Sequence, residues 1–262
     1  FALQYTGGTT GVSKGVKLTQ KSLLANVAQC LDVIKINNDF LHCSTTISPL
    51  PLYHIYAYAL CFGILPAIRG HSVLIPNPRD TVSFIKAIKK VKFDIFCGLN
   101  SLFVSLLESA DFKKLDFSNL KLTLSGGMAL MPIVAEEWSK LTGCEISEGY
   151  GMTEASPVIS MNPSGFQKLG SAGIPLAGTE VKVIDDTGAF KPVDQAGELC
   201  IKGPQMMDGY WNDDEKTSKT IIDGWLHTGD IVTVDKEGYV TIVDRLKDMI
   251  IVSGFNLSLI HI

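Results

Sequence analysis

A strand–helix–strand pattern is clearest in residues 120–151, whose sequence is LKLTLSGGMALMPIVAEEWSKLTGCEISEGYG. The apolar segment Leu120–Ser125 predicts a buried strand, which leads into the pair Gly126-Gly127. A helix is expected after this pair, because a proline stands where a first helical turn tolerates it. Cys144–Ser147 predicts a second strand, which leads into Gly149-Tyr150-Gly151. Strands joined by a helix in this way pair in parallel, so ligands are expected at their carboxyl ends.

The same alternation of strands and helices extends over the first 150 residues. Apolar positions at three- and four-residue steps predict helices after Thr19, which is placed as a cap, and after Thr81. Further strands are predicted at Leu3–Tyr5, Val16–Leu18, Val73–Ile75 and Asp94–Cys97. The predicted fold class is therefore α/β, with a parallel sheet.

The pattern changes near residues 165–173. Short alternating segments separated by turn residues follow, which is typical of a small β-rich subdomain with few helices. The predicted strands are Glu180–Ile184, Glu198–Lys202, Ile231–Val234 and Tyr239–Val243.

The composition excludes several classes of protein. Apolar residues make up 46% of the 262 residues and charged residues 19%, which excludes a disordered chain. The net charge of −4 and the sequence pI near 5.7 argue against a general nucleic-acid binder. The longest apolar run, Ile55–Ile68, is shorter than the roughly 18 residues that a spanning helix needs. A buried core helix is expected there.

Six cysteines are spread along the chain, and no two have the two-residue spacing typical of zinc clusters and redox pairs. Most lie in apolar stretches, where a free cysteine behaves as a small buried apolar residue. We therefore expect reduced core cysteines in an intracellular protein, without a zinc cluster. They are Cys30, Cys43, Cys61, Cys97, Cys144 and Cys200.

A loop rich in glycine and threonine, TGGTTGVSKG, occupies Thr6–Gly15. Its glycines allow successive N–H groups to point at one anion, and Lys14 adds a positive charge. The loop therefore predicts a polyphosphate site, although it lacks the Gly-Lys-Ser/Thr of a Walker loop. A flexible glycine turn is the alternative, but it leaves the hydroxyls and the lysine unexplained. The hydroxyls belong to Thr6, Thr9, Thr10 and Ser13.

Two further stretches could contact a nucleotide. In Glu148–Glu154, Tyr150 offers a stacking face for a base, and Glu154 offers oxygens for a magnesium ion. Asp230 can accept both hydroxyls of a ribose, and Arg245 can add cationic contacts to ribose or phosphate. A tight turn with an exposed glutamate, and two charged β-turns, are the structural alternatives.

Taken together, these loops resemble the adenylate-forming superfamily, which contains acyl-CoA synthetases, luciferases and peptide-synthetase adenylation domains. The resemblance runs from residue 3 to about residue 256, and Pro49–Ile55, Asn77–Asp80 and Gly203–Met207 resemble the bacterial long-chain fatty-acid–CoA ligase branch. The segments that follow the family's order and rough spacing are Tyr5–Gly15, Gly149–Glu154, Gly197–Gly203, Gly209–Trp211, Trp225–Asp230 and Asp244–Lys247.

The resemblance implies that ATP activates a long-chain fatty acid to an acyl-adenylate, which coenzyme A then converts to acyl-CoA. It implies ATP and Mg²⁺, with coenzyme A as co-substrate. It also implies an α/β AMP-binding core over residues 1–168 and a β-rich subdomain over residues 169–244. A hinge and the start of a further domain are expected at residues 245–256, and residues 257–262 match nothing in the family's pattern.

The resemblance also assigns roles residue by residue. Thr6 and Glu154 would hold magnesium, and together with Lys14 and His54 they are the candidate catalytic residues. His54 would lie near the carboxylate of the acyl chain, with a hydrogen-bonded core histidine as the alternative. The nucleotide-binding candidates are Thr6, Gly7, Gly8, Thr9, Thr10, Gly11, Ser13, Lys14, Gly126, Gly127, Gly149, Tyr150, Gly151, Thr153, Asp230 and Arg245.

The remaining expectations concern the C-terminal part and the surroundings of the protein. Lys247 matches the family's hinge, and Gly254 and Phe255 match the loop that approaches coenzyme A. The chain is expected to be a piece of a longer enzyme. Because it lacks the family's C-terminal catalytic lysine, it is expected to form little or no thioester by itself. A cytoplasmic protein is expected, and a fatty substrate is compatible with peripheral membrane contact. A ligase for an aryl, medium-chain, luciferin-like or amino acid, and a non-catalytic binding fragment, remain alternatives.

Overall fold

The computed structural model describes residues 1–6, 13–35, 42–245, 249–252 and 255–258. The chain divides into two compact units. Unit 1 comprises residues 1–30, 150–161 and 171–262, and unit 2 comprises residues 31–149 and 162–170. The domain boundaries expected from the sequence stay predictions.

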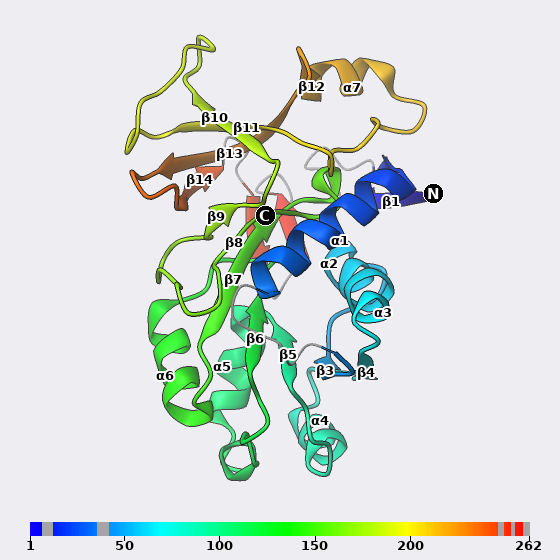
Figure 1. The fold of residues 1–262 in the computed structure, drawn as a ribbon, viewed down its shortest axis with the longest axis vertical. Coiled ribbons are helices and arrows are strands. Elements are labelled where there is room, and N and C mark those ends of the chain that lie inside the picture. The colour runs from blue at the N-terminus through cyan, green and yellow to red at the C-terminus, as the bar shows by residue number, and fades with distance from the viewer. Residues whose placement is uncertain (7–12, 36–41, 246–248, 253–254, 259–262) are drawn as a thin grey trace. The chain divides into compact units, whose positions relative to one another are not determined.

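Unit 2 contains a parallel sheet, as the sequence predicted. The strands pair in the order β4-β3-β5-β6-β7, and every pair is parallel. In Figure 1 these strands have helices beside them, among them α4, α5 and α6. The strands are β3 (Thr45–Ser48), β4 (His71–Leu74), β5 (Ile95–Gly98), β6 (Leu122–Ser125) and β7 (Ile146–Gly151), whose last two residues belong to unit 1.

Aromatic side chains form the centre of the unit 2 core. Trp138 is fully buried, and its ring centroid lies 4.8 Å from that of Phe103 and 5.0 Å from that of Phe96. Phe96 comes from the sheet, whereas Phe103 and Trp138 come from α5 and α6, so this cluster fastens both helices to β5. The helices are α4 (Thr81–Ile88), α5 (Asn100–Glu108), the short turn η3 (Phe112–Lys114) and α6 (Pro132–Thr142).

The apolar run near residue 55 is helical, as expected. It forms α2 (Ile55–Ala59), the π-helical turn η2 (Leu60–Ile64) and α3 (Leu65–Ala67). One side of this run is buried, whereas Phe62 is exposed. Among the helices that the structure describes, none combines the length and the apolar character needed to cross a membrane.

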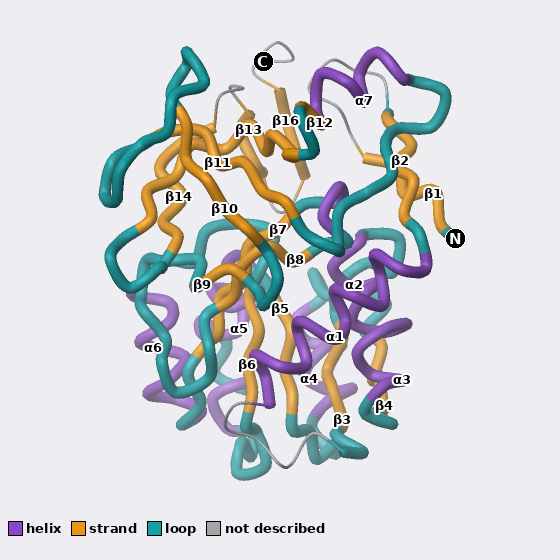
Figure 2. The backbone as a smooth tube through the Cα atoms, turned by 45° about the horizontal axis from the view of Figure 1, so that its top comes forward, coloured by secondary structure: helices purple, strands orange, loops and turns teal. Residues whose placement is uncertain are grey.

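Unit 1 is mainly antiparallel. Figure 2 shows β10, β11 and β13 side by side, and the sheet order is β10-β11-β13-β12, with β14 paired to β13. Strand β1 pairs with β2, β8 with β9, and β15 with β16, all antiparallel. The strands are β1 (Ala2–Thr6), β2 (Lys14–Leu18), β8 (Val158–Met161), β9 (Ile174–Pro175), β10 (Glu180–Ile184), β11 (Gly197–Lys202), β12 (Ile221–Ile222), β13 (Trp225–Val234), β14 (Val240–Arg245), β15 (Met249–Val252) and β16 (Phe255–Ser258).

Side chains cap the first turns of helices α1 and α7 in unit 1. Helix α1 (Gln20–Lys35) begins after Thr19, whose Oγ1 accepts a hydrogen bond from the Ser22 N–H at 2.9 Å and so confirms the predicted cap. Helix α1 continues from unit 1 into unit 2. Helix α7 (Asp214–Thr220) and the short turn η4 (Thr153–Ala155) complete the unit.

All six cysteines are free. Cys30, Cys97, Cys144 and Cys200 are buried, which agrees with the expectation of core cysteines. Cys43 differs, because it lies exposed in the turn before β3, with a left-handed backbone (φ 60°).

Candidate nucleotide-binding site

The ends of the β1–β2 hairpin bring two of the predicted phosphate ligands together. Thr6 and Lys14 lie opposite each other as the last register pair of the hairpin. Ser13 is exposed next to this pair. The loop candidates Gly7, Gly8, Thr9, Thr10 and Gly11 lie outside the described residues.

Tyr210 connects the candidate phosphate lysine to the candidate magnesium ligand. The Lys14 ammonium lies over the Tyr210 ring, 5.1 Å from its centroid, within the range of a cation–π contact. The Tyr210 hydroxyl donates a hydrogen bond to Glu154 Oε1 at 2.8 Å. Burial, followed by the Glu154 charge, raises the pKa of Tyr210, so its hydroxyl keeps its proton and remains a donor at neutral pH. One side chain therefore contacts both charged candidates.

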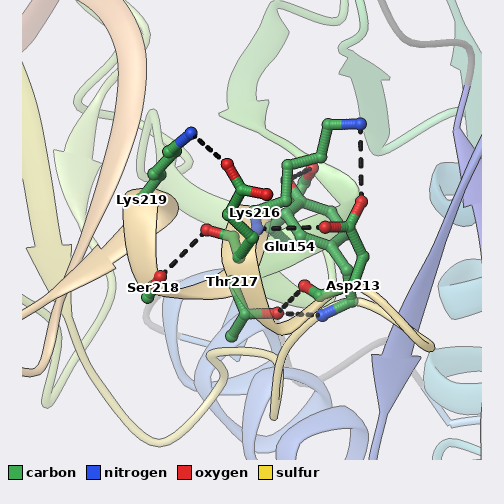
Figure 3. Close-up of polar contacts among 8 residues, drawn as sticks. Glu154, Asp213, Lys216, Thr217, Ser218 and Lys219 are labelled. Atoms are coloured by element: carbon green, nitrogen blue, oxygen red, sulfur yellow. Dashed lines mark hydrogen bonds and ion pairs between the residues drawn. The ribbon is translucent and has the colours of Figure 1, made fainter.

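Helix α7 fixes the backbone of Tyr210. The Tyr210 N–H donates to Thr217 Oγ1 at 2.9 Å, and Thr217 Oγ1 donates to the Asp213 carbonyl oxygen at 2.8 Å. Asp213 also caps α7, because its Oδ1 accepts from the Lys216 N–H at 3.0 Å. Figure 3 shows this first turn of α7, with Glu154 in the same view. The helix therefore holds Tyr210 in position for its contact with Glu154.

Glu154 has the chemistry and the setting of a magnesium ligand. It lies in turn η4, and only 8% of the residue is exposed. Its carbonyl oxygen accepts from the Met207 N–H at 2.8 Å, which fixes the backbone of the turn. Carboxylate oxygens are the ligands that magnesium prefers, so this buried carboxylate fits such an ion. Thr153, the candidate for the α-phosphate, begins the same turn and is half-buried.

The ribose candidate Asp230 contacts the base-stacking candidate Tyr150 directly. The Tyr150 hydroxyl donates to Asp230 Oδ2 at 2.5 Å, although the two residues are 80 positions apart in the sequence. Both residues are buried, and the Asp230 N–H donates to Thr228 Oγ1 at 3.1 Å. A short hydrogen bond to a carboxylate is stronger than one between neutral groups, so it orients both side chains.

The C-terminal candidates are described only in part. Strand register places Arg245 opposite Asp230 on β13 and β14. Phe255 pairs with Val252 in the β15–β16 hairpin. Lys247 and Gly254 lie outside the described residues.

The glycine candidates of unit 2 lie where backbone segments approach closely. A methyl group added at Gly126 would lie 3.3 Å from the Gly149 carbonyl oxygen and 3.4 Å from the Tyr56 ring. Gly127 has a φ of +80°, a left-handed conformation that favours glycine. Steric and conformational constraints therefore account for both glycines, whether or not a ligand binds beside them.

Glu148, which the sequence did not single out as a ligand, holds the segment after these glycines. Its Oε1 accepts a hydrogen bond from the Leu130 N–H at 3.0 Å. Burial raises the pKa of Glu148 to about 7, and the Leu130 bond only partly opposes this effect. The signal available in the sequence was a glutamate immediately before Gly149-Tyr150-Gly151.

His54 has a structural role at the start of α2. Its Nδ1 accepts a hydrogen bond from the Tyr56 N–H at 3.3 Å, so it caps the helix. The side chain is exposed, yet neighbouring atoms displace enough water to lower the pKa of His54. A neutral capping histidine accounts for this geometry, and its acyl role stays a prediction.

Comparison with known proteins gives the family of the chain. The model of the family described as "AMP-binding enzyme" matches residues 1–211. The chain belongs to this family. Membership agrees with the two glycine-rich stretches, both of which fall inside the matched region.

Several similar proteins share one name, long-chain-fatty-acid–CoA ligase. A long-chain-fatty-acid–CoA ligase of Escherichia coli O6:H1 is 47% identical over 258 residues, and the Bacillus subtilis ligase of that name is 37% identical over 257. Each alignment covers 97% of this chain, but only 46% and 45% of the relative. A 4-coumarate–CoA ligase of Humulus lupulus is 38% identical over 266 residues. The chain spans about half the length of the curated relatives it matches.

Solved structures of adenylate-forming enzymes have the same fold. ATP-bound MatB from Rhodopseudomonas palustris matches with a TM-score of 0.84 and 31% identity, over 97% of this chain and 50% of that one. The anthranilate CoA ligase AuaEII in complex with anthranoyl-AMP matches with a TM-score of 0.85 and 28% identity, over 99% of this chain and 50% of that one. The predicted fold class is therefore confirmed.

Proposed function

We propose that this chain forms the nucleotide-binding part of an enzyme that activates long-chain fatty acids with ATP and transfers them to coenzyme A. The supporting observation in the structure is Tyr210, which contacts both Lys14 and Glu154. A cation for phosphates and a carboxylate for magnesium are the two charges that ATP activation requires. The identity to long-chain-fatty-acid–CoA ligases over 97% of this chain supports the choice of acid.

The chemistry explains why the nucleotide is needed. A carboxylate oxygen attacks the α-phosphorus of ATP, the bond to the β-phosphate breaks, and pyrophosphate leaves. The thiol sulfur of coenzyme A then attacks the carbonyl carbon of the acyl-adenylate, AMP leaves with the bonding electrons, and the thiol proton passes to solvent. Charge develops on phosphate oxygens in the first step, so fixed cations and N–H donors are the stabilising groups.

In this proposal Lys14 attracts the β- and γ-phosphates, with Thr6 beside it, and Asp230 accepts the ribose hydroxyls. Glu154 and Thr6 hold magnesium, which when bound neutralises phosphate charge. The Tyr210 hydroxyl orients the Glu154 carboxylate. Tyr150 orients Asp230. These residues lie in unit 1.

A long-chain acid also bears on where the enzyme works. Such acids partition into membranes, so we propose a cytoplasmic enzyme that meets its substrate at the inner face of the membrane.

Pyrophosphate exchange tests the acid. A protein that carries this sequence at the full length of its relatives is mixed with ATP, magnesium, labelled pyrophosphate and one carboxylic acid at a time. Palmitate should drive exchange, whereas amino acids should not. Exchange with amino acids and none with palmitate would contradict the proposal.

An aryl acid is the second candidate substrate. The 38% identity to a 4-coumarate–CoA ligase over 98% of this chain favours it. The same assay separates the two, because an aryl-acid ligase would exchange pyrophosphate with 4-coumarate and not with palmitate. MgATP binding by the present chain, measured by calorimetry, tests the nucleotide role independently of either acid.

A further inference from the structure

Three potential metal ligands meet on the antiparallel sheet of unit 1. Glu198 and Cys200 lie two positions apart on β11, so their side chains point to the same face. Strand register places His227 of β13 directly opposite Cys200. Figure 2 shows these two strands side by side. The ligand atoms of the three side chains all lie within 4.8 Å of one another.

The distances within this cluster match those between ligands of one metal ion. His227 Nδ1 lies 3.0 Å from Glu198 Oε2 and 3.5 Å from Cys200 Sγ. Ligands at zinc bond lengths in a tetrahedron are separated by about 3.4 Å for nitrogen and oxygen and about 3.6 Å for nitrogen and sulfur. Small side-chain movements would therefore bring all three atoms into the coordination shell of one ion.

We propose that Glu198, Cys200 and His227 bind a divalent cation of borderline softness, best matched by Zn²⁺. Thiolate, imidazole and carboxylate together are a zinc-like ligand set, whereas magnesium and calcium select oxygens alone. Three protein ligands leave the fourth position to water. The cluster shares no residue with the proposed magnesium ligands Thr6 and Glu154.

The surroundings of the cluster orient one ligand and leave part of the cluster accessible to solvent. The Gly229 N–H donates to Glu198 Oε1 at 3.0 Å, which orients the carboxylate and leaves Oε2 towards His227. Such contacts to the second oxygen of a ligand strengthen metal sites. Cys200 is fully buried, but the side chains of Glu198 and His227 each keep 19% of their surface exposed, so an ion can enter from their side.

Metal binding at this cluster releases protons. Without an ion, burial and then the Glu198 charge raise the pKa of Cys200 to about 12, so the thiol is protonated at neutral pH. Binding of the ion would use the thiolate of Cys200 and the Nδ1 lone pair of His227, so the thiol proton would be released.

The experiment titrates Zn²⁺ into the metal-free chain against a coloured zinc indicator. One ion per chain is expected, and Co²⁺ in its place should give the charge-transfer absorption of a cobalt–thiolate bond. Cys200→Ser and His227→Gln should each weaken Zn²⁺ binding at least about tenfold, and Cys200→Ser should remove the cobalt–thiolate band. Circular dichroism checks that each variant is folded.

Matched controls use the same residue types elsewhere in the chain. Cys43→Ser replaces an exposed free cysteine and His71→Gln an exposed histidine, and neither should change Zn²⁺ affinity. Zn²⁺ binding that survives both cluster variants would overturn the proposal, as would the lack of any binding that competes with the indicator. The cobalt spectrum of the unmodified chain decides the case if a cluster variant fails to fold, because the proposal requires a thiolate ligand.

Discussion

Tyr210 is buried and contacts two charged side chains. Its ring contacts the Lys14 ammonium and its hydroxyl contacts the Glu154 carboxylate, while only 3% of the residue is exposed. The contribution of the hydroxyl can therefore be separated from that of the ring by substitution.

Tyr210→Phe should lower the free energy of unfolding by about 1.5 to 3 kcal/mol, because a buried carboxylate loses a hydrogen-bond donor. The ring over Lys14 remains in this variant. Urea denaturation followed by circular dichroism measures the change, with Tyr5→Phe, at an exposed tyrosine, as the control. If both variants had the same free energy of unfolding, the hydrogen bond to Glu154 would not contribute to stability.

Glu154→Ala should lower pyrophosphate exchange about 100-fold in the protein at the full length of its relatives, because the variant removes the proposed magnesium ligand. In the present chain, the same substitution should remove most of the gain in ATP affinity that magnesium gives. Calorimetric titration of ATP with and without magnesium measures this second effect. Glu145→Ala, at an exposed glutamate, is the control. Unchanged magnesium dependence would exclude Glu154 as a ligand.

Glu148 should make stability depend on pH. Burial raises the pKa of Glu148 from its ordinary 4.5 to about 7, so the folded chain holds this proton more tightly than the unfolded chain. The stabilisation is present below about pH 4.5 and is lost as the pH rises through about 7. Glu148→Gln stays neutral, so its stability relative to wild type should increase by about 1 to 3 kcal/mol between pH 4.5 and 8. Denaturation curves of Glu148→Gln and wild type between pH 4.5 and 8 measure this difference. For the control Glu145→Gln, the stability difference from wild type should not change with pH.

At the scale of elements, the clearest contact is between helix α6 and strand β6. The Trp138 indole N–H donates to Thr123 Oγ1 at 3.0 Å, and both residues are fully buried. Thr123→Val keeps the shape of the side chain but leaves this N–H without its acceptor, which should cost about 1 to 3 kcal/mol. Thr123→Ser retains the acceptor and should cost less. If Thr123→Val had the same free energy of unfolding as wild type, the Trp138–Thr123 hydrogen bond would not stabilise the packing of α6 on β6.

Elements with one strong periodic signal were predictable, and those with mixed signals were not. The strand–helix–strand segment around Trp138 was expected, because its apolar pattern and its proline agree. Strand β3 was not identified, since Thr45, Thr46 and Ser48 give it a polar sequence although it is buried in the sheet. Helix α7 was not identified either, because it has no buried residue and so lacks an apolar face.

The candidate site shows the same division. Its charged candidates could be located in the sequence because each stands in a recognisable sequence motif. Tyr210 received no role, since no periodicity or spacing predicts that residues 14, 154 and 210 meet. The cluster at Cys200 was not predicted for a related reason. Its third ligand, His227, lies on a neighbouring strand, and only the strand register places His227 opposite Cys200.

At the scale of the whole molecule, nucleotide binding and stability are linked. MgATP at 100 times its dissociation constant should stabilise the folded chain by about 2.7 kcal/mol. For a chain of this size, that corresponds to a rise in Tm of about 5 to 10 °C. Asp230→Asn weakens the proposed ribose contact, so it should show a smaller rise at the same MgATP concentration. Thermal unfolding followed by circular dichroism measures both, and an equal rise would exclude the ribose role of Asp230.

The bond that orients Asp230 also means that its carboxylate, the proposed ribose ligand, already has a hydrogen-bond donor in Tyr150. The Tyr150 phenol donates to one carboxylate oxygen of Asp230, so a ribose bound there in the proposed way would have to replace this bond with its own donors. A ribose brings two hydroxyls to this exchange, whereas a 2′-deoxyribose brings one. Under the proposed ribose role of Asp230, this exchange would favour ATP over dATP before any chemical step begins.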